Sequence, residues 1–166
     1  MCFLTRLYSV FLLTLVLSAC GFHLRGALDL SDDMAPVYLQ VGSVQELGRE
    51  IRSLLQANKV AVTESFEQAR TVLALSSESR QNRVLSVDSS GRAREYLLTY
   101  TAAFSVQLKP AKAEEMSMQV SRSLLFDENA VLAFANEADV VYSELRRDAA
   151  RRILQKLQAY SARQKQ

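Results

Sequence analysis

The sequence predicts an α+β fold: a two-layer sandwich of two helices packed on a roughly four-stranded, mixed and mostly antiparallel sheet. Residues 96–108 alternate between apolar and more polar positions, which is typical of a long strand with one buried face. Residues 44–55 and the segment after about residue 136 repeat apolar residues at intervals of three and four, which is typical of helices. A sheet with one apolar face needs a cover, and two amphipathic helices can provide it.

Length and composition fit one globular domain. The chain has 166 residues, 49% of them hydrophobic and 23% charged, so it can bury a single sizeable core. A formal net charge of +2 gives no whole-molecule reason to bind nucleic acid, and we expect no such partner. Two cysteines and one histidine leave little material for a metal site or a thiol enzyme, so we expect no cofactor and no metal.

Residues 1–19 have the features of a cleaved lipoprotein signal peptide. Arg6 precedes a mostly apolar run at residues 7–17, which is shorter than the roughly 20 residues that a transmembrane helix needs. The segment ends in Leu-Ser-Ala-Cys at residues 17–20, which resembles the bacterial lipobox. In lipoproteins of that kind the cysteine is lipidated and becomes the first residue. Cys20 is therefore predicted to hold the domain to a membrane.

This motif also predicts the redox state and the destination of the chain. Cys2 leaves with the signal and Cys20 is blocked by lipid, so the mature chain can form no disulfide. The next residue is Gly21 rather than the Asp that resembles an inner-membrane retention signal, which favours the outer membrane. Residues 20–35 then form a lipidated tether, and residues 36–166 form the sandwich domain.

The domain is expected to begin with a strand and a helix. Residues 37–41 predict a short strand. The helix that follows has its apolar stripe at residues 44–55, and Ser43 and Glu46 fit a capping box at its start. A brief extension or strand end is expected at residues 59–62.

Three long strands come next, in the order of an antiparallel meander. The first has a strand pattern at residues 71–77 that resumes at residues 84–87, before the turn signal Asp-Ser-Ser-Gly at residues 88–91. The second strand is 96–108 and the third is 116–126. A final helix is predicted from about residue 136 to about residue 161, with charged residues around most of its circumference.

Arginine usage suggests an anion-binding site. Fifteen of the 20 basic residues are arginine, the better bidentate partner for phosphate; a GC-rich genome is the alternative explanation. Four of them surround the predicted turn, opposed only by Asp88: Arg80, Arg83, Arg92 and Arg94. They form either a solvated face or a site for an anionic ligand. Arg122 lies on the apolar parity of its strand, and is either a strand-edge residue or part of the same patch.

No arrangement of residues predicts catalysis. His23 lies three residues from Cys20, where neither a walled pocket nor an orienting partner is expected. The sequence contains no Gly-rich phosphate loop, metal-ligand spacing or nucleophile elbow. The adjacent acids at 114–115 and 127–128 fit solvated turns. We therefore predict that the protein is not an enzyme.

Several segments resemble one known family. Residues 20–26, Cys-Gly-Phe-His-Leu-Arg-Gly, resemble the start of the mature chain in the LptE family of lipopolysaccharide-assembly lipoproteins. Residues 90–96 resemble the family's Gly-containing turn followed by Glu-Tyr and a long strand. Residues 144–150 resemble its last helix, and residues 122–127 resemble the strand before that helix.

This resemblance implies an αβ sandwich anchored in the outer membrane, facing the periplasm and the lumen of the β-barrel protein LptD. It implies that the chain plugs and supports this barrel and binds lipopolysaccharide. The candidate contacts to lipopolysaccharide phosphates are then Arg80, Arg83, Arg92, Arg94 and Arg122. Family members can carry a basic residue in the loop before the last helix, whereas residues 134–136 have none.

Two other functions remain open from the sequence. The chain could be an auxiliary lipoprotein of an ABC-type lipid transporter or an envelope scaffold, with no barrel partner. An envelope hydrolase has only the adjacent acids in its favour.

Overall fold

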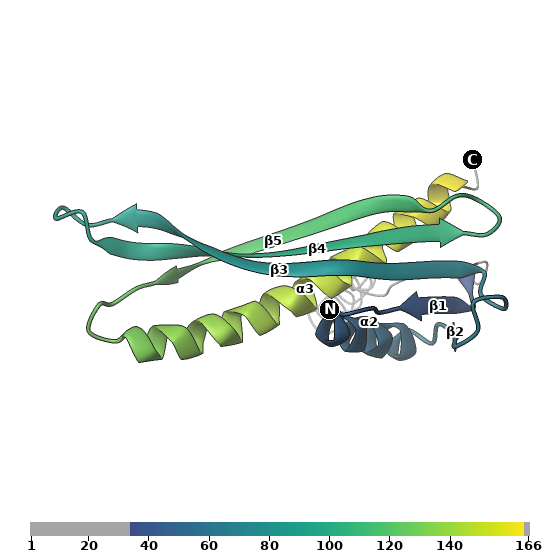
Figure 1. Ribbon diagram of the computed structural model, residues 1–166, viewed down its shortest axis with the longest axis horizontal. Helices are drawn as coiled ribbons and strands as arrows, with labels where there is room; N and C mark the ends of the chain where they lie inside the picture. Colours follow the sequence, from purple (N-terminus) through teal and green to yellow (C-terminus); the bar gives the residue numbers. More distant parts are fainter. Residues whose placement is uncertain (1–33, 165–166) are drawn as a thin grey trace, which may run out of the picture.

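The predicted two-layer α+β architecture is confirmed. A computed structural model describes residues 34–164, in which two helices cover one face of a five-stranded mixed sheet (Figure 1). Residues 1–33, which include the predicted signal peptide, Cys20 and nearly all of the tether, lie outside the described residues. No helix in the described part is long and apolar enough to span a membrane.

The sheet has the strand order β2-β1-β3-β4-β5, in which β1 runs parallel to β2 and β3 and the other pairs are antiparallel. One strand more than predicted is present because residues 62 and 63 pair with β1. The elements in chain order are β1 (Val37–Gln40), α2 (Gln45–Ala57), β2 (Val62–Thr63), β3 (Thr71–Val87), β4 (Ala93–Leu108), β5 (Glu114–Leu125) and α3 (Val131–Gln164).

Strand β3 is one continuous strand of 17 residues, although the sequence shows a strand pattern only at its two ends. Its middle, residues 76–83, is polar, and most of it is exposed. A register shift between Leu75 and Ser77 also changes which parity faces the helices. Alternation of polarity therefore cannot show that residues 76–83 belong to a strand. Their backbone pairing with β4 keeps β3 continuous.

Two predictions about the helices are wrong. The N-cap of α2 is Val44 with no side-chain cap, because the carboxylate of Glu46 contacts Arg49 and Arg146 instead of its own helix terminus. Helix α3 begins at Val131 rather than near residue 136, so residues 134–136 lie in its first turns and not in a loop. The exposed apolar residues in those turns hide the helical period.

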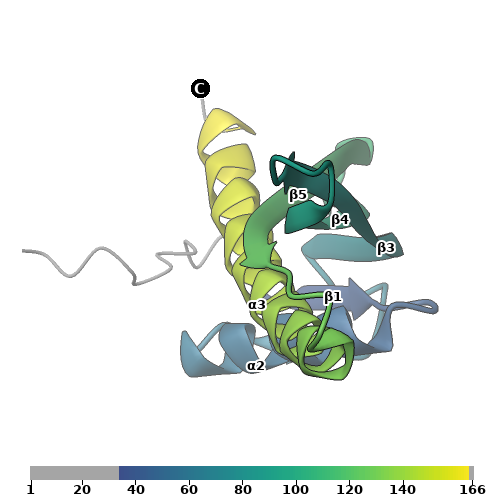
Figure 2. The same ribbon diagram turned by 90° about the vertical axis from the view of Figure 1, so that its left-hand side faces the viewer.

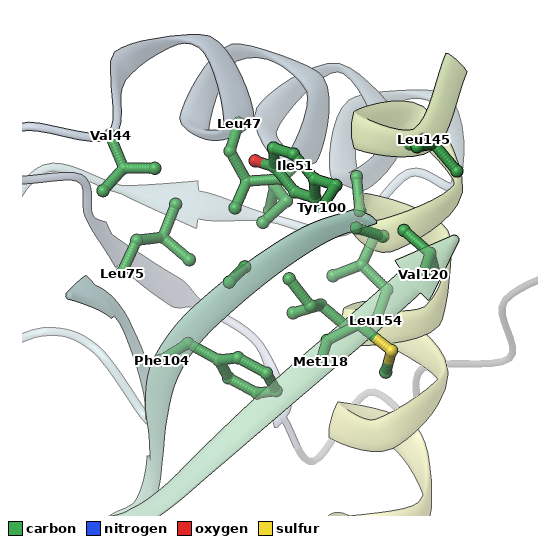
Figure 3. Close-up of a cluster of buried hydrophobic side chains, with 14 of the residues drawn as sticks. Val44, Leu47, Ile51, Leu75, Tyr100, Phe104, Met118, Val120, Leu145 and Leu154 are labelled. Carbon is green, nitrogen blue, oxygen red and sulfur yellow. The ribbon is translucent and has the colours of Figure 1, made fainter. Parts of the chain in front are cut away.

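The hydrophobic core lies between β4 and both helices. One parity of β4 is fully buried between residues 98 and 106: Leu98, Tyr100, Ala102, Phe104 and Val106. Leu47 and Ile51 of α2 and Leu154 of α3 pack against this row from the helical layer (Figure 3). The other parity of β4 faces away from the helices, and no helix or strand within residues 34–164 covers the long strands on that side (Figure 2).

A buried arginine links both helices to the sheet. Arg146 of α3 has only 8% of its side chain exposed. Its Nη1 donates a hydrogen bond to Glu46 of α2 at 2.8 Å, and its Nε lies 3.9 Å from the carboxylate of Glu78 in β3. The hydroxyl of Tyr100 in β4 donates to the same Glu78 carboxylate. Burial, together with that carboxylate acceptor, raises the pKa of Tyr100.

We predict that Arg146→Ala lowers the free energy of unfolding by about 2–3 kcal/mol, the cost of removing a buried charge-assisted hydrogen bond and leaving two carboxylates without their shared partner. Urea denaturation measures this change. Arg147→Ala is the matched control, because Arg147 is 58% exposed and lies 3.6 Å from Glu50. An exposed pair of this kind contributes less than about 1 kcal/mol. Equal losses for the two variants would contradict the linking role of Arg146.

Candidate functional site

The hairpin predicted around residues 88–91 is present and joins β3 to β4. Gly91 adopts a positive φ of 79°, which glycine tolerates without strain. The Asp88 carboxylate accepts hydrogen bonds from the amides of Ser90 at 2.8 Å and Arg92 at 3.0 Å. Both hydrogen bonds lower the pKa of Asp88 below its ordinary 3.8, and the bond from the Arg92 amide has the larger effect. The carboxylate therefore supports the turn above pH 3.8, and this support is lost as the pH falls through the lowered pKa.

The five candidate arginines do not form one group. Arg80 faces the helices, where it lies 3.6 Å from Asp139 and 5.4 Å from the ring centre of Tyr142. Arg122 also faces the helices and forms an ion pair with Glu144. Arg83, in register with Leu97, lies on the opposite face of the sheet. Arg92 and Arg94 line a common cleft.

That cleft, of about 420 Å³, lies between the β3–β4 turn and the segment that follows β5. Its two arginines share it with three acids: Asp88, Asp127 and Glu128. Arg92 Nε lies 3.0 Å from the Asp88 carboxylate, and its Nη1 lies 2.5 Å from that of Glu128. An anionic ligand would have to compete with these carboxylates, although exposed ion pairs are weak.

The β3–β4 turn, the end of β5 and the start of α3 lie at the same end of the molecule, which we call the distal end (Figure 1). Tyr96, Phe126 and Phe134 form a cluster with ring centres 5.1–5.3 Å apart. Seven exposed large hydrophobic residues lie in or near these segments: Val84, Leu85, Val87, Leu125, Val131, Leu132 and Val140. The distal end therefore combines arginines with apolar surface, as a ligand with an anionic head and acyl chains requires.

The side of β3, β4 and β5 that neither helix covers, which we call the open face, has Glu115 and Glu95 in its outer rows but little charge in its middle. Strand register aligns four rows of three residues there: Ser77, Ala103 and Ser117; Ser79, Thr101 and Gln119; Gln81, Thr99 and Ser121; Arg83, Leu97 and Ser123. Nine of these twelve are Ser, Thr or Gln, and one is charged. The sequence showed the alternation of β4, but the register of three strands was needed to reveal the surface.

A further set of basic residues lies on α3 beside β5. It lines two clefts that share Arg151 and Asp148. The signal in the sequence was the spacing of four residues between Arg147 and Arg151 and between Arg152 and Lys156, which places each pair on one side of a helix. Within residues 34–164, no group of three or more His, Cys, Asp or Glu side chains could hold a metal ion.

Comparison with known proteins places these features in a family. Residues 34–157 match the family model LptE, described as Lipopolysaccharide-assembly. The LPS-assembly lipoprotein LptE of Photorhabdus laumondii is 30% identical over 149 residues, which cover 88% of this chain and 81% of that protein. The protein of the same name from Pectobacterium atrosepticum is 27% identical over 148 residues, covering 88% of this chain and 80% of its own.

Solved structures of bacterial lipoproteins are similar to this chain in both fold and sequence. The crystal structure of the rare lipoprotein B from Shewanella oneidensis has a TM-score of 0.72 and 28% identity, and covers 78% of this chain and 98% of that one. The solution structure of an uncharacterized lipoprotein B from Nitrosomonas europaea has a TM-score of 0.67 and 26% identity, and covers 86% and 93%.

The aromatic cluster is expected to hold the distal end together. Phe134→Ala should lower the free energy of unfolding by about 1.5–3 kcal/mol, because it removes two ring contacts and leaves a partly filled cavity. It should also speed hydrogen exchange in the β3–β4 hairpin. Leu132→Ala is the control, since Leu132 is 81% exposed and its loss should change stability by no more than about 0.5 kcal/mol. Unchanged hairpin exchange in Phe134→Ala would contradict this role.

Proposed function

This chain belongs to the LptE family of lipopolysaccharide-assembly lipoproteins, and from that premise we propose how it takes part in lipopolysaccharide assembly. Lipidated Cys20 anchors it in the outer membrane. The domain faces the periplasm and the lumen of an LptD-like β-barrel, which it plugs and supports. It binds lipopolysaccharide there and has no catalytic role.

The open face is the observation that supports a barrel partner. A well-solvated protein surface has about 25–35% charged residues, whereas the four middle rows of this face have one charged residue, Arg83, among twelve. Packing it against another protein removes few charges from water, which is the costly step in burying polar surface. The interior of a large membrane β-barrel is polar. Small hydroxyl and amide side chains can exchange their water for hydrogen bonds with such a wall.

Other occupants fit the open face less well. A lipid surface requires apolar or basic side chains, and the twelve positions contain one leucine and one arginine. A sugar chain is commonly held by aromatic stacking, and none of the twelve is aromatic.

The distal end supports lipopolysaccharide binding. Its exposed apolar residues suit acyl chains, and Arg92 and Arg94 beside them suit phosphates. Of the five arginines predicted from the sequence, these two are the ones that we propose as contacts at this end.

Charges placed on the open face should prevent assembly with the barrel. We expect Thr101→Lys combined with Gln119→Lys to reduce at least tenfold the amount of outer-membrane barrel protein recovered after mild detergent extraction, because two unpaired charges would be buried. The matched control is Ser53→Lys with Gln56→Lys, at exposed positions of α2. Thermal midpoints of the two variants should agree within about 3 °C.

Equal recovery from the open-face variant and its control would remove the open face from the interface. Failure of the unaltered chain to recover any barrel protein would contradict the barrel partnership itself. That result would favour an auxiliary lipoprotein of a lipid transporter or scaffold.

The anchor has its own test. Cys20→Ala should leave the domain folded, with an unchanged circular dichroism spectrum, but release it from membranes, because no acyl chain remains to insert. Fractionation of cells into membrane and soluble parts measures this. A variant that stays fully in the membrane fraction of cells lacking the barrel partner would contradict the lipid tether.

A further inference from the structure

A basic groove runs between the edge strand β5 and the exposed side of α3. Two adjoining clefts of about 480 and 540 Å³ form it, and they have Asp148 and Arg151 in common. From the level of Glu144 to that of Lys156 it follows α3 for about 18 Å, at 1.5 Å per residue. Its basic residues are Arg122, Arg147, Arg151, Arg152 and Lys156.

These cations outnumber the acids within the groove. Five basic residues line the two clefts together with two carboxylates, Glu144 and Asp148. In the distal cleft, by contrast, two arginines meet three acids. The groove is therefore the better site for an anion on charge alone, although the sequence pointed to the hairpin.

The ion pairs inside the groove leave positive charge uncompensated. Asp148 is shared by two arginines, at 3.5 Å from Arg151 and 3.1 Å from Arg152. The ammonium of Lys156 donates to the backbone carbonyl of Ser117, on β5, at 3.1 Å. No carboxylate lies within ion-pair distance of Lys156 in the described part of the chain. One carboxylate thus faces three cations along this stretch of helix.

The side chains are accessible to a ligand. Arg151 and Arg152 are 56% and 52% exposed, so their pairs with Asp148 are weak and can rearrange around a stronger acceptor. A phosphate offers each guanidinium two oxygens in the fork geometry that arginine prefers. The sulfur-containing side chain of Met118 and the methyl of Ala159 line the same cleft and provide apolar contact beside the cations.

We propose that this groove binds the phosphate groups of an anionic lipid headgroup, with lipopolysaccharide as the source. The proposal rests on the proposed function, because it adds a second contact with the same class of ligand, separate from Arg92 and Arg94. The free phosphate ion and a glycerophospholipid share this chemistry, and the experiment distinguishes them.

Binding is measured on the full lipidated chain in a neutral detergent at low salt. The groove variant combines Arg151→Ala, Arg152→Ala and Lys156→Ala. It should bind lipopolysaccharide roughly tenfold or more weakly, and added salt should reduce this difference. A control of equal charge change combines Arg49→Ala, Arg52→Ala and Lys112→Ala, which lie outside the groove and should leave affinity within about twofold.

Binding measurements with other ligands identify the molecule that supplies the phosphate groups. Lipopolysaccharide whose phosphates have been removed should bind the unaltered chain and the groove variant equally. Phosphatidylglycerol in the same detergent, and millimolar inorganic phosphate as competitor, should show no comparable dependence on the three residues. A tenfold loss for phosphatidylglycerol as well would overturn the assignment to lipopolysaccharide.

A direct readout is protection from phenylglyoxal, which modifies exposed arginines and is located by mass spectrometry. Lipopolysaccharide should protect Arg151 and Arg152 and leave Arg49 reactive. Equal affinity of the groove variant, with no protection at these positions, would overturn the inference while leaving the proposed function standing. Failure of the unaltered chain to bind lipopolysaccharide at all would instead contradict the proposed function. Loss of affinity only with Arg92→Ala and Arg94→Ala would place the phosphates at the hairpin and not in the groove.

Discussion

The alternation of side chains along β4 is the constraint on which the rest of the structure depends. β4 lies between β3 and β5, so its pleat determines which face every neighbouring residue occupies. Between residues 98 and 106 one parity is completely buried, and the two helices cover it. Arg146 then ties both helices to β3 and β4 through Glu46, Glu78 and Tyr100. Because most large apolar residues of β4 lie on the side that packs against the helices, the other side of the sheet has no helix over it within residues 34–164.

A nearly balanced net charge conceals three different surfaces. The middle of the open face has one charged residue, the distal end combines arginines with apolar side chains, and the groove beside α3 is basic. The contacts that we propose with a barrel wall, acyl chains and phosphates each require different chemistry, and each would use a different one of these surfaces. The open face lies on the side of the sheet away from the helices, the groove lies between β5 and α3, and the distal end lies at one end of the long strands.

The sequence was sufficient for the layers of the fold, since local periodicity reports which residues are buried. It was insufficient wherever the partner of a residue is distant. Glu46 fits a capping box by spacing, but its partner Arg146 lies on the last helix. The sequence left Arg122 as either a strand-edge residue or part of the hairpin patch, and the structure places it on the edge strand β5 in an ion pair with Glu144 of α3. The polar middle of β3 has no periodicity to read. The open face and the groove required strand register and helix placement, which no single segment encodes.

The central claim is that the open face meets the wall of a β-barrel. Photocrosslinking in living cells tests it most directly, with a photoreactive residue placed at Ser79, Thr101 or Gln119 in turn and at Gln56 of α2 for comparison. The account predicts adducts with an outer-membrane barrel protein from all three positions of the row, more abundant than from Gln56. Adducts from Gln56 alone, or none from the open face in cells where the barrel is present, would contradict it.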